Sequence, residues 1–207
     1  MKIVLFGPPG AGKGTQAEHI SKMYGLPHIS TGAVLRKNIE LKTQIGLVAL
    51  KYIERGFLAP DDVMMDVLGS ELPRCRHGFL LDGFPRTLAQ AEALEKITDV
   101  DVVLNIEIDA ETVVDRIVNR MVCTKCGKNY NKKIHPVEVC DCGHPLSLRK
   151  DDSEEVVRDR LRVYESDTRP VAGFYRERGK LVEIDGNGTI DEVFQKIKAV
   201  LDGYNKE

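Results

Sequence analysis

A glycine-rich run near the N-terminus has the residue types of a phosphate-binding loop. It reads Gly7-Pro8-Pro9-Gly10-Ala11-Gly12-Lys13-Gly14-Thr15 and lies between a short apolar run and a helical pattern. Glycines let a loop curl so that successive N–H groups point at phosphate oxygens, and the following helix adds the positive end of its dipole. Lys13 is expected to reach the β- and γ-phosphates of a nucleotide. A plain strand-to-helix turn is the alternative, but the spacing of the glycines and the lysine favours phosphate binding.

The residue after this lysine departs from the usual loop. Phosphate-binding loops commonly have Ser or Thr directly after the lysine, where the hydroxyl binds Mg²⁺. Here Gly14 takes that position, and the hydroxyl comes one residue later, at Thr15. A direct role for Thr15 in binding Mg²⁺ therefore stays open.

A second candidate site lies where another apolar run ends in an acidic residue. Asp82 ends the run that begins at Gly78, and Gly83-Phe84-Pro85-Arg86 follow it. Nucleotide-binding proteins with such a loop place a carboxylate at a strand end, where it organises Mg²⁺. An isolated Asp there more often forms a turn, but its combination with the Lys13 loop favours a nucleotide site. Arg86 would then lie on the side where parallel strands open onto a ligand crevice.

Cationic residues gather around a segment that is rich in cysteine. From Arg120 through Lys150 there are seven Lys and Arg against two acids. A solvated basic surface is one interpretation, but phosphoryl transfer also uses many cations, because its catalysis is mostly positioning and charge neutralisation. Arg116 and Arg120 are four residues apart and are expected to share one helix face. The arginines around the segment are Arg116, Arg120, Arg149, Arg158 and Arg160.

Two acids, Asp151 and Asp152, follow this basic segment. They either anchor the segment to basic residues through ion pairs or begin a helix over Asp152–Arg162 as N-terminal acids.

Four of the five cysteines form two pairs, and the fifth, Cys75, is alone. Two pairs in a short segment are typical of one tetrahedral Zn²⁺, whereas a disulfide framework would distribute cysteines along a secreted chain. A reduced loop without metal is the alternative, but four clustered thiols have no evident packing role. The paired cysteines are Cys123, Cys126, Cys140 and Cys142.

The fourth zinc ligand is the open point of this site. The second pair is Cys-x-Cys, one residue shorter than the usual knuckle. Cys142 is the first choice because a thiolate is the softest donor within reach. The alternatives are Asp141, His144 and His135.

Short apolar runs alternate with helical patterns, which predicts an α/β fold with a parallel sheet covered on both faces. Strands are expected over Ile3–Phe6, Gly78–Leu81, Val102–Ile108 and Lys180–Ile184, with a weaker fifth over Pro27–Ser30. Helices are expected over Gly14–Tyr24 and Ala110–Arg120. Two segments interrupt the alternation and are interpreted as insertions: Thr31–Pro60, which is mainly helical, and Val122–Leu148, which is loop-like. His19, His28 and His77 have no partner that the sequence identifies, and we interpret them as structural.

Charge and hydropathy exclude several classes of protein. The chain has 30 Lys and Arg against 32 Asp and Glu, so its net charge of −2 gives no general attraction to nucleic acid or an acidic membrane. The apolar runs are far shorter than the ~20 residues of a membrane span, and the N-terminus lacks the features of a secretory signal. We therefore expect a cytoplasmic protein.

In combination, these motifs resemble those of the adenylate kinase family along the whole chain. The resemblance implies reversible transfer of the γ-phosphoryl group of MgATP to AMP, giving two ADP, and hence a role in adenine nucleotide homeostasis. It also implies a P-loop domain with a five-stranded parallel sheet. The matching motifs are Gly7–Thr15, Ser30-Thr31-Gly32 with Leu35-Arg36, Asp82–Thr87 with Gln90, Asp115-Arg116 with Arg120, Arg149–Asp152, and Arg158 with Arg160.

The resemblance further implies three structural parts and a set of partners. The core would comprise residues 1–29, 60–120 and 159–207, the nucleoside-monophosphate-binding domain 30–59, and a lid 121–158. The long lid with cysteines resembles the zinc-bearing bacterial form, in which the metal is structural. A monomer is expected, with ATP and AMP or ADP as partners and no nucleic acid or membrane. One departure is Ala33, where the family often has an acidic residue.

Site residues are also implied by the resemblance, residue by residue. The ATP-binding set is Gly10, Ala11, Gly12, Lys13, Gly14, Thr15, Arg116, Arg120, Asn129, Tyr130 and Gly188. The AMP-binding set is Thr31, Arg36, Phe57, Leu58, Ala59, Gly83, Phe84, Pro85, Arg86, Gln90, Arg149 and Arg160. The catalytic set is Lys13, Asp82, Arg86, Arg120, Arg149 and Arg160, of which the five cations would stabilise the transition state.

Three other functions compete with this one. A uridylate or cytidylate kinase would be expected to have a much shorter lid, and Thr31 and Gln90 are family positions that favour adenine. A P-loop switch or motor would need Ser or Thr after Lys13. A zinc module for nucleic acid would need aromatic residues that stack on bases, and the lid offers Tyr130 alone.

Overall fold

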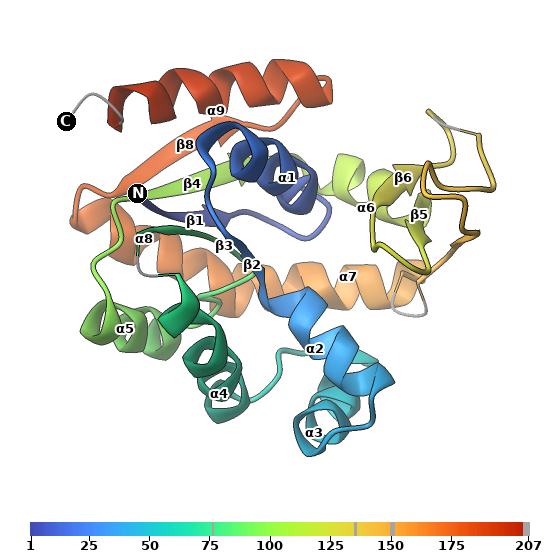
Figure 1. Cartoon of the computed structure of the whole chain (residues 1–207), viewed down its shortest axis with the longest axis horizontal. Coiled ribbons are helices and arrows are strands. Elements are labelled where there is room, and N and C mark those ends of the chain that lie inside the picture. The colour runs from blue at the N-terminus through green and yellow to red at the C-terminus, as the bar shows by residue number, and fades with distance from the viewer. Residues whose placement is uncertain (76, 135, 150–151, 205–207) are drawn as a thin grey trace.

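The computed structural model describes residues 1–75, 77–134, 136–149 and 152–204. Its centre is a five-stranded parallel sheet with the strand order β2-β3-β1-β4-β8 (Figure 1). All four predicted strands and the weaker fifth are confirmed. Because every neighbouring pair is parallel, the carboxyl ends of the strands meet at one edge of the sheet. The strands are β1 (Lys2–Phe6), β2 (His28–Ser30), β3 (Phe79–Asp82), β4 (Val102–Glu107) and β8 (Leu181–Asp185).

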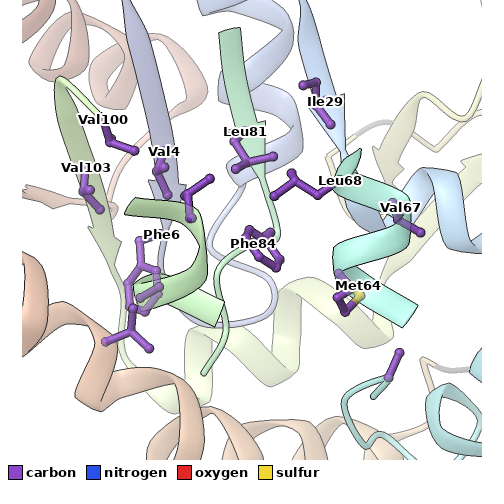
Figure 2. Packing of buried hydrophobic residues seen from close by; sticks show 14 of the residues in the cluster. Val4, Phe6, Ile29, Met64, Val67, Leu68, Leu81, Phe84, Val100 and Val103 are labelled. Atoms are coloured by element: carbon purple, nitrogen blue, oxygen red, sulfur yellow. The ribbon is translucent and has the colours of Figure 1, made fainter. Parts of the chain in front are cut away.

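Helices cover both faces of this sheet, as the alternation of apolar runs predicts. Ile3 and Leu5 point to the face covered by α1 (Lys13–Tyr24) and α9 (Ile190–Tyr204). Val4 and Phe6 point to the other face, where Figure 2 shows them with Leu81, Phe84 and Val103. The helices of that face are α4 (Asp61–Glu71), α5 (Leu88–Ile97) and α8 (Arg169–Glu177). Burial of strands on both sides holds their carboxyl ends in fixed positions, where the candidate site residues lie.

The first insertion is helical, as predicted for Thr31–Pro60. It contains α2 (Thr31–Glu40) and α3 (Gln44–Ile53), which pack directly on each other. Thr43 caps α3, because its Oγ1 accepts from the N–H of Gly46 at 3.1 Å. After α4, a short 3₁₀ turn over Leu72–Arg74 leads back toward β3.

The second insertion is more regular than the loop that the sequence predicts for Val122–Leu148. It holds an antiparallel sheet in the order β6-β5-β7, built from β5 (Arg120–Cys123), β6 (Asn129–Asn131) and β7 (Leu146–Ser147). These strands are short and carry polar residues, so no alternating apolar pattern marks them in the sequence.

The helix predicted over Ala110–Arg120 ends earlier than expected. Helix α6 spans Ala110–Val118, and Asn119 ends it with its amide nitrogen donating to the Asp115 carbonyl at 2.7 Å. Arg120 then begins β5. The prediction that Arg116 and Arg120 share one helix face is therefore wrong, because a side-chain bond to the backbone competes with the next helical turn.

One long helical segment links the second insertion back to the core. Ser153 caps α7 (Glu154–Val163), because the Oγ of Ser153 accepts from the N–H of Val156. A π-helical turn over Tyr164–Thr168 then joins α7 to α8. Pro170 has no N–H to donate to the carbonyl four residues earlier, so the regular α-helical pattern is interrupted there. Among the described residues, no helix combines the length and the apolar character needed to cross a membrane.

Candidate active site

The glycine-rich loop connects β1 to α1, at the edge where the strands of the central sheet end. Two of its glycines are required by close approach. A Cβ on Gly7 would lie 2.3 Å from the carbonyl oxygen of Ile106 on β4, and one on Gly10 would lie 2.9 Å from Ile117 Cγ1 on α6. Both glycines also have positive φ, of 136° and 79°. The loop therefore lies tightly against β4 and α6 and leads into the N-terminus of α1, as a phosphate site requires.

Lys13, the first residue of α1, turns back over this loop. Its Nζ donates to the carbonyl oxygens of Gly7 at 2.8 Å and Pro8 at 2.7 Å. Burial lowers the pKa of Lys13 to about 7; Asp82 opposes this shift, while the nearby Arg86, Arg160 and Arg120 add to it. The arginines disfavour the charged form of this lysine. An anion bound at the loop would supply the opposite charge and would therefore favour the charged form.

Asp82 ends β3 beside Leu5 of β1, which brings its carboxylate next to the loop. A Cβ placed on Gly14 would lie 3.8 Å from Asp82 Oδ2. Burial alone would raise the pKa of Asp82, but the His28 imidazole and the Lys13 ammonium outweigh it and hold the pKa below its usual range. A charged carboxylate at this point can organise a cation that accompanies phosphates.

His28 is a neighbour of the site that the sequence did not identify. Its Nε2 lies 3.6 Å from Asp82 Oδ2, and Ser30 Oγ donates to the same oxygen at 3.5 Å. The sequence identified no partner for His28, and the structure places it beside Asp82. The signal was its place in the weak fifth strand, which runs parallel to β3 with Ser30 opposite Asp82 and His28 only two residues earlier.

The segment after β3 forms a network of side-chain and backbone bonds. Arg86 donates from Nε to the Gly83 carbonyl and from its backbone N–H to Gln90 Oε1, both at 2.8 Å. Thr31 Oγ1 donates to the Asp82 carbonyl at 3.2 Å. Both Thr31 and Gln90 are buried. The network thus fixes Gly83, Arg86, Thr31 and Gln90, which the resemblance assigns to AMP, in one place.

Asp61 supports this network and was missed by the sequence analysis. Its Oδ1 accepts from Gln90 Nε2 at 2.6 Å, and Thr87 Oγ1 donates to the same carboxylate at 3.3 Å. Asp61 begins α4, so the sequence suggests only an acid at a helix N-terminus. Its contact with α5 becomes visible only once the two helices are placed together.

The helical insertion approaches the site through two further contacts. A Cβ on Gly32 would lie 3.2 Å from Arg36 Nη1. Burial lowers the pKa of Arg86 below its usual value; the charge of Asp82 opposes this shift and that of Arg36 adds to it. Gly56, with φ of 78°, passes so close to α7 that a Cβ would lie 3.1 Å from Arg160 Cγ. Phe57 is exposed, while Ala59 is buried just before α4. Leu58 lies between them and is half-buried.

Arg120 and Arg160 share one buried carboxylate, that of Asp152. Arg120 donates from Nε to Asp152 Oδ2 at 2.8 Å and from Nη2 to Oδ1 at 2.5 Å, and Arg160 Nη1 lies 3.5 Å from Oδ1. Asp152 precedes α7, whose cap is Ser153, so of the two interpretations the ion-pair anchor is confirmed for Asp152. Lys150 and Asp151 lie outside the described residues. The carboxylate offsets the repulsion between two arginines and fixes their guanidinium groups.

The second insertion reaches the loop through Asn129. A Cβ on Gly14 would lie 3.9 Å from Asn129 Nδ2, and Asn129 Oδ1 accepts from Arg149 Nη2 at 2.9 Å. Arg116 lies on the other side, where its Nη2 donates to the Gly186 carbonyl at 3.2 Å, in the turn that contains Gly188. Arg158, by contrast, pairs with Glu154 on the exposed surface of α7.

The four paired cysteines come together, as their spacing predicts. Their Sγ atoms all lie within 4.8 Å of one another, with Cys123 and Cys142 3.5 Å apart and Cys126 and Cys140 3.6 Å apart. A tetrahedral Zn²⁺ with Zn–S bonds of 2.3 Å would separate its sulfurs by about 3.8 Å. The backbone N–H of Cys126, followed by that of Lys125, lowers the pKa of the Cys123 thiol to about 6. The donor set therefore fits one closed, four-thiolate metal site.

The alternative fourth ligands have other partners. Asp141 pairs with Lys128 at 2.6 Å, and His144 Nδ1 lies 2.9 Å from the Cys142 carbonyl oxygen. His135 lies outside the described residues. The geometry therefore favours Cys142.

Comparison with known proteins gives a consistent result. The family model described as "Adenylate kinase" matches residues 5–180. Proteins named adenylate kinase are similar to nearly the whole chain: that of Clostridium kluyveri is 46% identical over 97% of this chain and 98% of its own length. That of Methanosarcina barkeri is 47% identical with the same coverage, and that of Caldanaerobacter subterraneus subsp. tengcongensis is 45% identical over 100% of this chain and 99% of its own.

Proposed function

The chain belongs to the adenylate kinase family, and we propose that the residues gathered around the Lys13 loop divide that family's reaction among them. The protein is a kinase that phosphorylates AMP with ATP, giving two ADP reversibly. The observation that carries the assignment of roles is that one carboxylate and three arginines lie near enough for their charges to act on Lys13. Phosphoryl transfer proceeds with charge spread over the transferred group, so this arrangement of fixed charges suits its transition state.

ATP would bind with its phosphates on the loop and α1. The N–H groups of Gly10 to Thr15 would donate to the β- and γ-phosphates, and Lys13 Nζ would move from the carbonyls of Gly7 and Pro8 to the phosphate oxygens. Arg116 and the turn with Gly188 would hold the base, since the bond from Arg116 to Gly186 fixes that turn. Asn129 and Tyr130 would cover the nucleotide from the lid.

AMP would bind between the helical insertion and the segment after β3. Gln90 would read the base, because Asp61 and the Arg86 N–H hold its amide in one orientation. The backbone of Phe57 to Ala59, with Gly83 to Pro85, would line this subsite beside Thr31. Arg36 and Arg86 would neutralise the AMP phosphate.

Arg120, Arg149 and Arg160 would act on the group in transfer. Asp152 holds two of them, and Asn129 holds the third, so each guanidinium is oriented before the nucleotides meet. We propose that residues 30–59 and 121–158 close over the core of residues 1–29, 60–120 and 159–207, which would exclude water from the phosphates.

Two metals accompany this proposal. Mg²⁺ enters with ATP, as adenylate kinases require, and Asp82 would orient its hydration shell from the end of β3. A structural Zn²⁺ would be held by Cys123, Cys126, Cys140 and Cys142, with the sulfur separations as support. Four thiolates leave no open coordination position, so this zinc would stabilise the lid and take no part in the chemistry.

We further propose that the enzyme acts as a cytoplasmic monomer whose partners are ATP, AMP and ADP. The near-balance of charge supports this, since it gives no drive toward nucleic acid or an acidic membrane.

A coupled assay with MgATP and each of AMP, GMP, UMP and CMP tests this assignment. AMP should be phosphorylated far faster than the other three. Gln90→Leu should narrow the preference for AMP, because it removes the amide that would hydrogen-bond to the base. Gln44→Leu on α3, the matched control, should leave the preference unchanged. Equal rates with two or more acceptors in the unmodified enzyme would overturn the role of Gln90.

A further inference from the structure

Tyr130 has a contact that its assignment to ATP does not explain. Its hydroxyl donates to Cys140 Sγ at 3.3 Å, and the same oxygen accepts from the backbone N–H of Asp141 at 3.3 Å. The two bonds form a short chain that runs from a backbone N–H through a hydroxyl to sulfur. Such chains strengthen each of their bonds, because each donor polarises the next.

The ring of Tyr130 is itself held in place. Tyr130 pairs with Met121 across β5 and β6, which fixes its backbone. Lys128 Nζ lies 5.3 Å from the ring centre, and Lys128 also pairs with Asp141. The hydroxyl therefore meets Cys140 from a fixed direction.

Donors of this kind matter at thiolate metal sites. A hydrogen bond to a coordinating atom fixes its orientation and moderates its charge, and the loss of such a partner typically lowers metal affinity by ~10–100-fold. Cys123 receives N–H bonds from Lys125 and Cys126, both at 3.4 Å. At Cys140, the hydroxyl of Tyr130 donates to the sulfur from outside the cysteine cluster.

We propose that Tyr130 is a positioning residue of the lid's metal site, whose hydroxyl supports the Cys140 thiolate and thereby slows the loss of the metal. The inference rests on the proposed zinc site and goes beyond it, because it gives Tyr130 a role that is separate from covering the nucleotide. The adjacent residue, Asn129, accepts a hydrogen bond from Arg149, which we propose acts on the transferred phosphate. Strand β6 therefore connects the proposed metal site to the proposed phosphate site.

The test compares Tyr130→Phe with Tyr24→Phe. Both changes remove one hydroxyl and keep the ring, and Tyr24 donates to Asp202 at the far side of α1 and α9. Each zinc-loaded protein is mixed with excess chromophoric chelator, and the rate of zinc transfer is measured. Tyr130→Phe should release zinc ~10-fold faster than the unmodified protein, and Tyr24→Phe at the unmodified rate.

A second measurement uses the protein loaded with Co²⁺. The thiolate-to-cobalt charge-transfer band reports electron density on sulfur, so it should shift in Tyr130→Phe and stay in place in Tyr24→Phe. A merely structural role for the hydroxyl would move neither this band nor the release rate at temperatures well below melting.

The outcomes separate the two proposals. Unchanged zinc release together with an unchanged cobalt band would overturn the role of Tyr130 and leave the zinc site standing. An unmodified protein that takes up no equimolar zinc would overturn the site and this inference with it. The KM for ATP at saturating zinc, measured in parallel, reports separately on the contact of the Tyr130 ring with the nucleotide.

Discussion

The central sheet and the lid are stabilised in opposite ways. In the sheet, Val4, Leu80, Val102 and Leu104 have no exposed surface, because helices cover both faces. Among the described residues from 121 to 149, the buried ones are Cys123 and Cys140. One region is therefore held by apolar burial, and the other contains a small antiparallel sheet and a cluster of four cysteine sulfurs. The difference shows that a region too small to form an apolar interior must be held by other contacts, which the proposed zinc site would supply here.

Removal of the metal should give the largest effect and should break the lid alone. A chelator should speed amide exchange in residues 121–149 by at least ~10³-fold, since structural zinc supplies most of the folding free energy of such modules. Exchange in β1 and β4 should not change, and turnover at low temperature should persist. Exchange by mass spectrometry measures both regions in one sample. If the core strands lose protection as fast as the lid, the two regions are not independent.

Lys13→Met should act on the chemistry of the core and leave the stability of the lid unchanged. Turnover should fall by ~10²–10³-fold, because one charge aimed at the transferring phosphate is lost. Binding of MgATP should weaken far less, since the charge acts mainly in the transition state. Calorimetry and the coupled assay measure the two quantities, with Lys22→Met at the exposed end of α1 as the control. A variant that keeps most of its turnover would remove Lys13 from the catalytic set.

Leu104→Ala tests how far apolar burial sustains the core. Leu104 has no exposed surface, so its truncation should lower the free energy of unfolding by about 2–5 kcal/mol. Val139→Ala in the lid should cost within about 0.5 kcal/mol, because that side chain is 55% exposed. Urea unfolding of the zinc-loaded proteins gives both values. Equal losses would show that the lid has an apolar interior of its own.

Asp152→Asn tests the junction between the two regions. The change leaves Arg120 and Arg160 without their shared charge partner, and we expect a loss of about 2–3 kcal/mol, since both arginines keep some contact with solvent. Glu154→Gln, which breaks the exposed pair with Arg158, should cost within about 0.5 kcal/mol. Unfolding monitored in the same urea series distinguishes them. A negligible effect of Asp152→Asn would show that solvent already screens the pair.

The smallest expected effect is the uptake of part of a proton by Lys13 when MgATP binds. The pKa of Lys13 in the folded protein is lowered to about 7. Between pH 7 and the ordinary lysine pKa, the unfolded protein therefore binds more protons than the folded one. The contribution of Lys13 to the free energy of unfolding thus rises with pH through that window. MgATP should raise the pKa and draw in part of a proton at pH 8, and almost none at pH 6. Calorimetry in buffers of different ionisation enthalpy measures the uptake. Undiminished uptake in Lys13→Met would assign it to another group.

The parts of the site that the sequence predicts are those in which neighbours along the chain act together. The loop before α1, Asp82 at a strand end and the cysteine pairs are visible as local patterns. Asp61 and His28 were missed because their partners, Gln90 and Asp82, are distant in sequence and come close only through packing. The lid strands were missed because β6 places polar residues, Asn129 and Asn131, opposite β5. Its sequence therefore lacks the alternation of apolar and polar residues by which strands are predicted.

The order of strands in the central sheet has a consequence for how the chain folds during synthesis. β1 lies at the middle of the sheet, between β3 and β4, and β8 completes the far edge only after most of the chain has been made. No neighbouring pair in that sheet is joined by a hairpin, so its contacts are long-range and slow to form. The β5–β6 hairpin is local, and it can form as soon as its residues leave the ribosome. The nascent chain can therefore form this hairpin, which carries Cys123 and Cys126, before β8 pairs with the free edge of β4. Ile3 and Leu5 of β1 also wait for α9 to cover them, and until then they depend on chaperones or on transient contacts with α1 for protection from aggregation.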